Sequence, residues 1–424
     1  MRTQIFVLIS LTVCLCSCKN SKTGKLVDNP DLKTIDVGKS IGKGRIVNIS
    51  EIATDIKYVP LETNKSSLIG KGAVVFYENG RIYVRFLRTI LQVFDSTGKY
   101  LFTFNKIGRG PQEYIDGLIQ IEKGTGNINV FESKGNIASI KRYSPEGKFL
   151  SNILLKNPVD LSTRRANQLS ESLYLIHITN RITKNDVEYF ALIVDTLSNI
   201  REMIPSPDIK MNKSSETKYV GKRVMNISAS KPPLYVNYYK DSLRICVGLG
   251  NTIFSFDHEK GTYPRYHIDY GKYRDFGNKN TTSSENPDRP ITAGGHYYIE
   301  NDNFLILSVE LGDYAHEPFI GKRWMTFDMV MERRYAYGLF NKKTGEFALL
   351  NQPVKGIPGF RDDILKGPPV VVHHLSEDNT GSHMILATDF KDYVSKNSTS
   401  SQLKKIADNL KDEDNPVIAL FKVR

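Results

Sequence analysis

Short apolar stretches separated by turn residues recur from residue 45 to the end of the chain. Clusters of glycine, asparagine, aspartate and serine bound them, which predicts short β-strands. The clearest are IYVRF (82–86), LQVFD (91–95), INVFE (128–132), LYLIHI (173–178), YFALIV (189–194), FLILSV (304–309) and YAYGLF (335–340). Helical periodicity is nearly absent. The best helix candidate is 400–413, where Leu403, Ile406, Ala407 and Leu410 share one face.

The strands repeat with a regular period. Segments 80–104 and 126–153 align, with their first glycines 46 residues apart and the turn glycines Gly98 and Gly147 49 residues apart. A repeat of this length with about four strands is typical of a β-propeller blade. A β-sandwich is the rival fold, because it also explains alternating strands, but it does not explain the period. Hairpins of the same form close later copies at 194–204, 256–268 and 340–350.

We therefore predict an all-β fold, a six-bladed β-propeller with four-stranded antiparallel blades. Five closing hairpins are visible in the sequence. A sixth blade would combine residues 45–62 with residues 370–424. Such pairing of N-terminal and C-terminal strands would close the ring and leave no open sheet edge. The propeller domain would then occupy residues 45–424.

The first residues have the pattern of a secretory signal. MRTQIFVLISLTVCLCSC contains one basic residue and an apolar run from Ile5 to Cys16, which is short for a membrane span. Leu15-Cys16-Ser17-Cys18 resembles the lipobox of bacterial lipoproteins, which implies a signal peptide at 1–17, cleavage before Cys18 and a lipid on its sulfur. An ordinary signal peptide cut nearby is the alternative. Residues 18–44, rich in Lys, Gly, Ser, Asn and Asp, would form a lipidated tether.

The residues after Cys18 bear on location. Lys19-Asn20 lacks the aspartate of inner-membrane retention and the acidic cluster of surface export. The lipobox resemblance therefore implies an outer-membrane anchor, with the protein facing the periplasm. Cys246 would be the one remaining cysteine, so no disulfide can form within a mature chain, and its apolar strand predicts a small buried hydrophobe.

The chain is basic, with a formal net charge of +12. Its lysines and arginines are scattered, and no nucleic-acid-binding motif is present, so we expect no nucleic-acid partner. The charge predicts a solvated surface that favours anionic partners.

Several segments occur in a recognisable order. They are YVPLET (58–63), VFDSTGKYL (93–101), IGRGPQEY (107–114), IFSFDHEKGTYPRYHIDYGKY (253–273), YGLFNKKTGEF (337–347), GFRDDILKG (359–367) and DNPVIALFKVR (414–424). Together they resemble the six-bladed β-propeller lipoproteins of Bacteroidota, which are related in architecture to NHL-repeat propellers. The resemblance covers nearly the whole mature chain and implies fold and envelope location, but no activity. Gln112 departs from the glycine that many relatives carry.

The stretch IGRGPQEYIDG (107–117) should connect the first and second visible blades. A phosphate cradle is unsupported, because no helix N-terminus follows. Arg109, Glu113 and Tyr114 could instead contact a ligand, or Glu113 and Tyr114 could join neighbouring blades by hydrogen bonds.

Other candidate contacts are scattered through the second half. The histidines show no metal-ligand spacing. His373 and His374 end the strand-like run PPVVVHH, and because adjacent strand residues point to opposite faces, only one could line a given pocket. Asp362 in GFRDDILKG and Trp324 in the insertion between Asp313 and Arg334 are further candidates.

We therefore expect a lipid-anchored cell-envelope module that binds a glycan, peptide or protein partner through the propeller face. The candidate ligand contacts are Arg109, Glu113, Tyr114, Trp324, Asp362 and His373. We expect no cofactor and no metal, and the lack of a catalytic constellation favours binding over catalysis. One alternative is a propeller hydrolase or lyase that uses channel carboxylates, with calcium as the one cofactor to consider. Another is a scaffold of an outer-membrane assembly.

Overall fold

The computed structural model describes residues 31–70, 72–86, 88–134, 137–156, 166–169, 172–184, 187–205, 216–220, 223–227, 234–240, 242–247, 250–257, 261–274, 291–324 and 328–424. The signal peptide at 1–17 and the lipidation site at Cys18 lie outside these residues.

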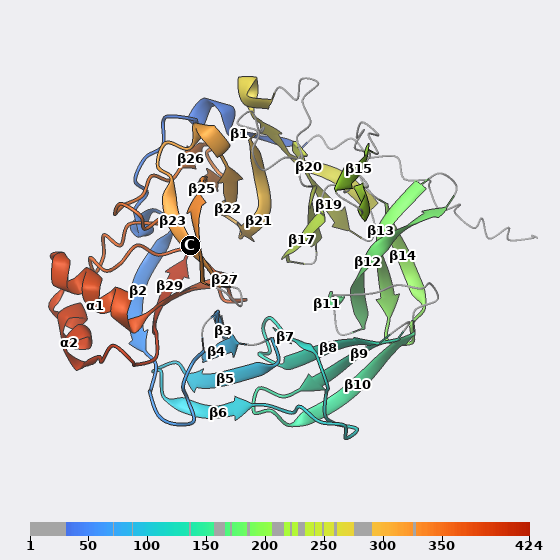
Figure 1. Cartoon of the computed structure of the whole chain (residues 1–424), viewed down its shortest axis with the longest axis horizontal. Helices are drawn as coiled ribbons and strands as arrows, with labels where there is room; N and C mark the ends of the chain where they lie inside the picture. The colour runs from blue at the N-terminus through green and yellow to red at the C-terminus, as the bar shows by residue number, and fades with distance from the viewer. Residues whose placement is uncertain are drawn as a thin grey trace, which may run out of the picture.

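Six antiparallel sheets of four strands stand in a ring, so the predicted six-bladed, all-β fold is confirmed (Figure 1). Blade 1 contains β3 (Val74–Glu78), β4 (Arg81–Phe86), β5 (Ile90–Asp95) and β6 (Tyr100–Phe104). Blade 2 contains β7 (Leu118–Ile121), β8 (Ile128–Lys134), β9 (Ile137–Tyr143) and β10 (Phe149–Lys156). Blade 3 contains β11 (Ala166–Gln168), β12 (Leu173–Lys184), β13 (Val187–Asp195) and β14 (Ile200–Pro205).

Blades 4 to 6 complete the ring. Blade 4 contains β17 (Leu234–Tyr239), β18 (Ser242–Val247), β19 (Thr252–Asp257) and β20 (Gly261–Asp269). Blade 5 contains β21 (Thr292–Glu300), β22 (Phe304–Glu310), β25 (Tyr335–Asn341) and β26 (Phe347–Leu349). Blade 6 contains β27 (His374–Leu375), β28 (Thr380–Ile385), β29 (Val417–Val423) and β2 (Ala53–Pro60). In each blade the strand named first lies nearest the centre of the ring (Figure 1).

The two ends of the chain share blade 6. β2 pairs antiparallel with β29, and Ile56 lies opposite Phe421. Every other neighbouring pair in the sheet comes from the C-terminal segment. Unfolding either end therefore opens the ring at the same place.

In several blades, an Asp or Asn side chain stabilises the turn between the third and fourth strands. This role explains why such a residue recurs in the sequence repeat. Asp95 accepts hydrogen bonds from the amides of Thr97 at 2.8 Å and Lys99 at 3.1 Å. Asp195 and Asn341 accept from turn amides in the same way. Such side-chain contacts replace missing backbone partners in a tight turn.

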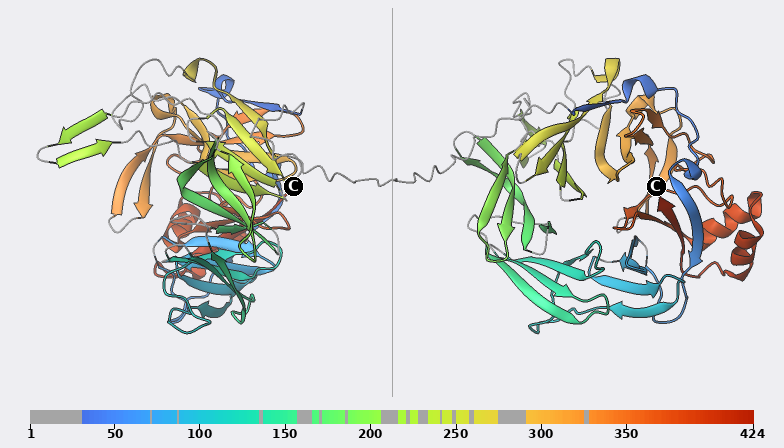
Figure 2. Two further views of the ribbon diagram at one scale, coloured as in Figure 1. Left: turned by 90° about the vertical axis from the view of Figure 1, so that its right-hand side faces the viewer. Right: turned by 180° about the vertical axis from the view of Figure 1, so that it is seen from behind.

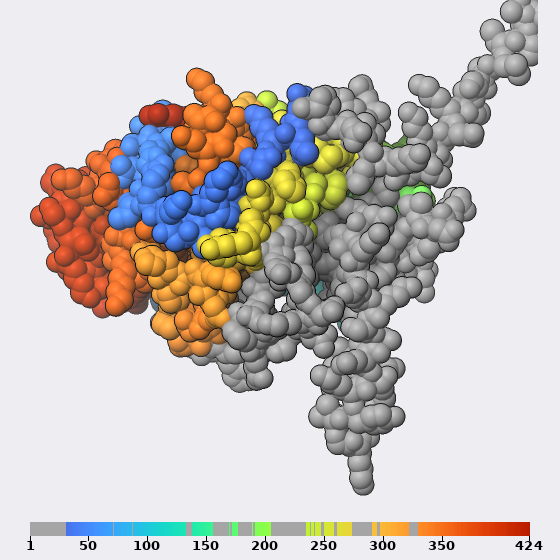
Figure 3. All heavy atoms as spheres, turned by 90° about the horizontal axis from the view of Figure 1, so that it is seen from above, coloured from blue at the N-terminus to red at the C-terminus, as the bar shows by residue number. Residues whose placement is uncertain are grey.

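The second half of the expected tether is attached to the propeller. β1 (Lys33–Asp36) pairs in parallel with the outer strand β20, and Ile35 lies opposite Ile268. The 3₁₀ turn Gly38–Ser40 follows, and Ser40 Oγ donates to Phe347 O at 3.1 Å. Figure 3 shows this dark blue segment lying across the yellow and orange blades. The sequence missed β1 because it is four residues long in a polar context.

The ring has two different faces. Because strand direction alternates within a blade, the first-to-second and third-to-fourth turns lie at one end, here named the turn face. The connections between blades lie at the other end, here named the loop face. Two extra hairpins project from the loop-face side of the ring (Figure 2). They are formed by β15 (Glu216–Val220) with β16 (Arg223–Ile227), and by β23 (Phe319–Trp324) with β24 (Asp328–Arg333).

Two helices connect β28 to β29 on the outside of blade 6 (Figure 1). α2 (Ser401–Asn409) falls within the predicted helical segment, and the Ser400 hydroxyl accepts from the Leu403 amide at its start. α1 (Ala387–Lys396) was not predicted. Its buried side chains Ala387, Phe390 and Val394 follow the i, i+3, i+7 spacing of a helix, a short signal that was missed.

Apolar side chains between blades form the core. Between blades 1 and 2 these include Tyr83, Leu91, Phe104, Ile119 and Tyr143. Cys246 belongs to the corresponding cluster between blades 4 and 5. Burial raises the pKa of this thiol to about 12, so it acts there as a small hydrophobe.

Candidate functional site

The loop that contains Arg109, Glu113 and Tyr114 joins β6 to β7 on the loop face. Glu113 Oε2 accepts a hydrogen bond from the Gly110 amide at 2.8 Å. The same carboxylate lies so close to Gly108 that a Cβ atom there would overlap it. Glu113 therefore shapes its own loop, and Arg109 is exposed beside it.

Tyr114 is fully buried between blades 1 and 2. Its hydroxyl donates to Thr89 O at 2.6 Å, and its ring stacks on Phe104 with centroids 6.1 Å apart. Thr89 lies in the turn before β5. The structure thus gives Tyr114 the blade-joining role that the sequence left open beside ligand contact.

Asp362 is also engaged internally. It is buried, and Oδ2 accepts from the Tyr58 hydroxyl and from the Gly367 amide, both at 2.8 Å. Oδ1 accepts from the amides of Ile364 at 3.0 Å and Leu365 at 2.9 Å. Oδ1 therefore fixes the shape of the 359–367 loop, and Oδ2 also holds the loop against β2.

Trp324 ends β23 of the projecting hairpin, and its side chain lies outside the described set. At the base of the hairpin, buried Phe319 packs against Tyr335 with ring centroids 5.3 Å apart. Further out, Ile320 and Val330 are both exposed. The hairpin is therefore anchored at its base and presents apolar side chains to solvent.

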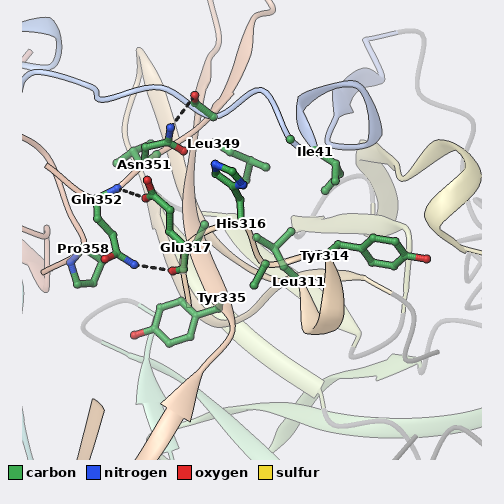
Figure 4. A pocket seen from close by; sticks show the side chains of 15 residues that line it. Ile41, Leu311, Tyr314, His316, Glu317, Tyr335, Leu349, Asn351, Gln352 and Pro358 are labelled. Carbon is green, nitrogen blue, oxygen red and sulfur yellow. Dashed lines mark hydrogen bonds between the residues drawn. The ribbon is translucent and has the colours of Figure 1, made fainter. Parts of the chain in front are cut away.

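A small pocket lies at the foot of this hairpin (Figure 4). Gln352 fixes one wall, because its amide donates to Glu317 Oε2 at 2.6 Å and its Nε2 donates to Glu317 O at 2.5 Å. Asn351 Nδ2 donates to Gly44 O at 2.8 Å, so the N-terminal segment forms another wall. The cavity volume of about 30 Å³ suits a water molecule or the tip of one side chain.

His373 lies immediately before β27, the innermost strand of blade 6. Its ring lies 4.6 Å, centroid to centroid, from that of His383 on β28. Part of His373 meets solvent, but the surrounding chain desolvates the ring, which lowers the pKa of His373 to about 4. The same cause lowers the pKa of His383 well below its usual value. Both imidazoles are therefore neutral at pH 7.

His374 has different neighbours. Its ring packs edge-on against Phe76 at 5.3 Å, and its Nε2 lies 3.7 Å from Glu78 Oε2 on β3. The two adjacent histidines thus contact different groups, as the strand alternation predicted.

The family model described as "Domain of unknown function (DUF4934)" matches residues 32–422. The chain belongs to this family. A search of curated proteins found no match.

Three solved structures resemble the DUF4934 propeller. The "Putative exported protein" of Bacteroides fragilis has a TM-score of 0.56 at 16% identity, covering 93% of this chain and 99% of that one. Inactivated virginiamycin B lyase from Staphylococcus aureus gives 0.37 at 11% identity, covering 87% and 99%. A protein of unknown function from Bacteroides caccae gives 0.31 at 10% identity, covering 67% and 89%. The first similarity shows the fold alone, and the other two are too weak to bear on function.

The predicted contacts do not converge on one site. Arg109, Glu113 and Tyr114 share a loop between blades 1 and 2, whereas Asp362 and His373 belong to the segment leading into blade 6. His383 was missed, because its proximity to His373 depends on strand pairing. Within the described ranges, no three His, Cys, Asp or Glu side chains form a group suited to a metal ion. Those ranges also contain no helix with the length and apolar character of a membrane span.

Sequence reasoning also missed a buried ionic network between blades 4 and 5. Glu300 accepts from Arg244 Nε at 2.8 Å, Lys342 Nζ at 2.6 Å, and the hydroxyls of Tyr266 at 2.9 Å and Tyr298 at 2.6 Å. Burial alone would raise the pKa of Glu300, but Arg244 and Lys342 outweigh it and hold the pKa below its usual value. The network joins blades 4 and 5.

Proposed function

We propose that this DUF4934 propeller is a lipid-anchored binding module of the cell envelope that recognises a partner through its loop face. Among a glycan, a peptide and a protein, the face favours a polypeptide. The observation that carries this choice is the gathering of exposed apolar side chains there: Ile107 (50% exposed), Ile115 (66%), Tyr314 (47%), Ile320 (66%) and Val330 (63%). Apolar side chains that are exposed in the free protein favour binding when a polypeptide covers them, because their burial removes apolar surface from water.

The apolar residues occupy two areas. Ile107 and Ile115 flank the loop between blades 1 and 2, beside exposed Arg109. Ile320 and Val330 lie on the β23–β24 hairpin, which stands clear of the ring (Figure 2). A polypeptide is long enough to contact both areas, and the small pocket at the foot of the hairpin suits the tip of one of its side chains.

The envelope location rests on the lipobox resemblance at Leu15–Cys18, which supports an outer-membrane anchor facing the periplasm. The Bacteroides fragilis neighbour is also named as exported. β1 runs parallel to β20, from the turn-face side towards the loop face. A tether that reaches β1 from the membrane would therefore approach from the turn-face side and leave the loop face directed away from the lipid.

The test is affinity capture from an envelope extract, with three forms of the protein compared. The wild type should capture a defined envelope protein, and Ile320→Ser combined with Val330→Ser should lose it. The matched control is Leu150→Ser combined with Leu154→Ser, because these leucines of β10 are similarly exposed, at 51% and 52%, but lie on the outer edge of blade 2. Equal capture by all three forms would contradict the assignment of the loop face.

A thermal-shift screen with glycans, peptides and cell-wall fragments decides among the partner classes, because a ligand of the folded state raises the midpoint by mass action. A shift with a peptide class supports the proposal. A shift with a sugar alone would instead indicate that the protein is a glycan-binding module.

A further inference from the structure

His373 and His383 are brought together where the start of β27 lies beside β28. The two rings approach to 4.6 Å between centroids, and their planes are inclined by 48°. Nδ1 of His383 is shielded from solvent, and no described group forms a hydrogen bond with it. A buried polar atom without a partner destabilises the folded state. A bound group that interacts with the lone pair of this nitrogen, as a metal ion or a hydrogen-bond donor does, would remove that cost.

The spacing can be compared with two imidazoles bound to one metal ion. A metal–nitrogen distance of about 2.0–2.1 Å, plus about 1.2 Å from nitrogen to ring centre, places each centroid about 3.2 Å from the metal. At a ligand–metal–ligand angle of about 90–110°, the centroids are then about 4.5–5.2 Å apart. The observed 4.6 Å lies in this interval.

We propose that His373 and His383 form a two-imidazole site for a divalent transition-metal ion of the kind that imidazole prefers, Zn²⁺ or Cu²⁺. Neutral imidazole is the form that binds metal.

The site would remain open on one side. No third His, Cys, Asp or Glu joins the pair among the described residues. The exposed part of His373 gives solvent access, so water or a donor atom of a bound molecule would complete the coordination sphere. Such a site should bind more weakly than a four-ligand structural zinc site. It should also discriminate against Ca²⁺ and Mg²⁺, which prefer oxygen ligands.

The test is a calorimetric titration of Zn²⁺ into metal-free protein that carries no polyhistidine tag, with Ca²⁺ titrated in parallel. One equivalent of Zn²⁺ should bind. His373→Ala and His383→Gln should each weaken binding by about tenfold or more, since even outer-shell changes at metal sites reach that range. The matched control is His374→Ala, because His374 is adjacent in sequence but faces Phe76 and Glu78. It should leave the Zn²⁺ affinity unchanged.

The outcomes are separable. Equal affinity in all variants would overturn the proposal, because the metal would then be bound elsewhere. Loss in His374→Ala to the same extent as in His373→Ala would also overturn it and assign the ion to His374 and Glu78. If His383→Gln does not fold, His373→Ala still decides, because its partly exposed position tolerates truncation. Failure here leaves the loop-face proposal untouched, since Ile320 and Val330 do not contribute to the pair.

Discussion

The two faces of the propeller are built differently. On the turn face, Glu78 and Glu300 each end an innermost strand, and each carboxylate bonds to neighbouring blades. Glu78 accepts from the amides of Gly124 of blade 2 at 3.1 Å and Glu377 of blade 6 at 3.2 Å. Glu300 accepts from the buried cation Arg244 of blade 4.

On the loop face, by contrast, Ile320 and Val330 are exposed on a projecting hairpin. Buried charges with several partners are sensitive to the loss of any one of them, whereas exposed apolar side chains contribute little to folding. The turn face should therefore be needed for ring stability, and the exposed hairpin of the loop face should be free to change with the partner.

The largest effect is expected for Glu300→Gln. The change keeps the side-chain shape but leaves Arg244 and Lys342 buried without their countercharge. Breaking a buried ion pair in this way should lower the free energy of unfolding by about 3–5 kcal/mol. Urea denaturation measures the loss, with the slope unchanged.

Asp302→Asn is the matched control, because Asp302 pairs with Lys240 at the surface of the same region. It should cost less than about 1 kcal/mol. Similar losses for the two variants would show that the Glu300 network is not special.

The sequence could predict the ring but not this network. The blade period, the turn glycines and the strand composition are local signals, and they predicted six blades correctly. Glu300 bonds to Arg244 and Lys342, which are 56 and 42 residues away, so their proximity depends on how the blades pack. The same limit explains why His373 was a candidate while its partner His383 was missed.

Polar residues of a loop can also have partners within the chain that the sequence does not show. Asp362 and Tyr114 were both predicted as candidate ligand contacts. In the structure both bond to the chain itself, Asp362 to Tyr58 and Tyr114 to Thr89. The residue types of a loop are visible in the sequence, but the direction of each side chain is not.

Asp362→Asn tests the structural role on the loop face itself. The amide cannot accept with both terminal atoms, so bonds from Tyr58 or from the loop amides are lost. We expect the free energy of unfolding to fall by about 1.5–3 kcal/mol, the range for hydrogen bonds to charged groups. Urea denaturation measures it, and partner capture should be unchanged.

The adjacent Asp363→Asn serves as its control, because exposed Asp363 bonds to Ser50 near the surface. Its effect on stability should be smaller. If Asp362→Asn has normal stability but no longer captures the partner, Asp362 contacts the ligand directly.

Tyr114→Phe should have a smaller effect. It removes the hydroxyl that donates to Thr89 O at 2.6 Å and keeps the ring packed on Phe104. The loss of one buried hydrogen bond should lower the free energy of unfolding by about 1 kcal/mol. Tyr100→Phe is the control, because the Tyr100 hydroxyl bonds to exposed Thr103. An unchanged unfolding midpoint for Tyr114→Phe would argue against its blade-joining role.

The smallest effect on stability is expected for Ile320→Ser combined with Val330→Ser. Both side chains are mostly exposed, so folding buries little of their apolar surface, and the change in the free energy of unfolding should stay within about 0.5 kcal/mol. The same variant should lose the envelope partner, because binding is where that apolar surface would be buried. Urea denaturation and affinity capture on one preparation separate the two effects. A loss of more than about 1 kcal/mol would show that the hairpin contributes to the fold, and the contrast between the faces would no longer hold. Normal stability with normal capture would instead keep the contrast and move the binding surface to the loop between blades 1 and 2, where Ile107 and Ile115 are exposed.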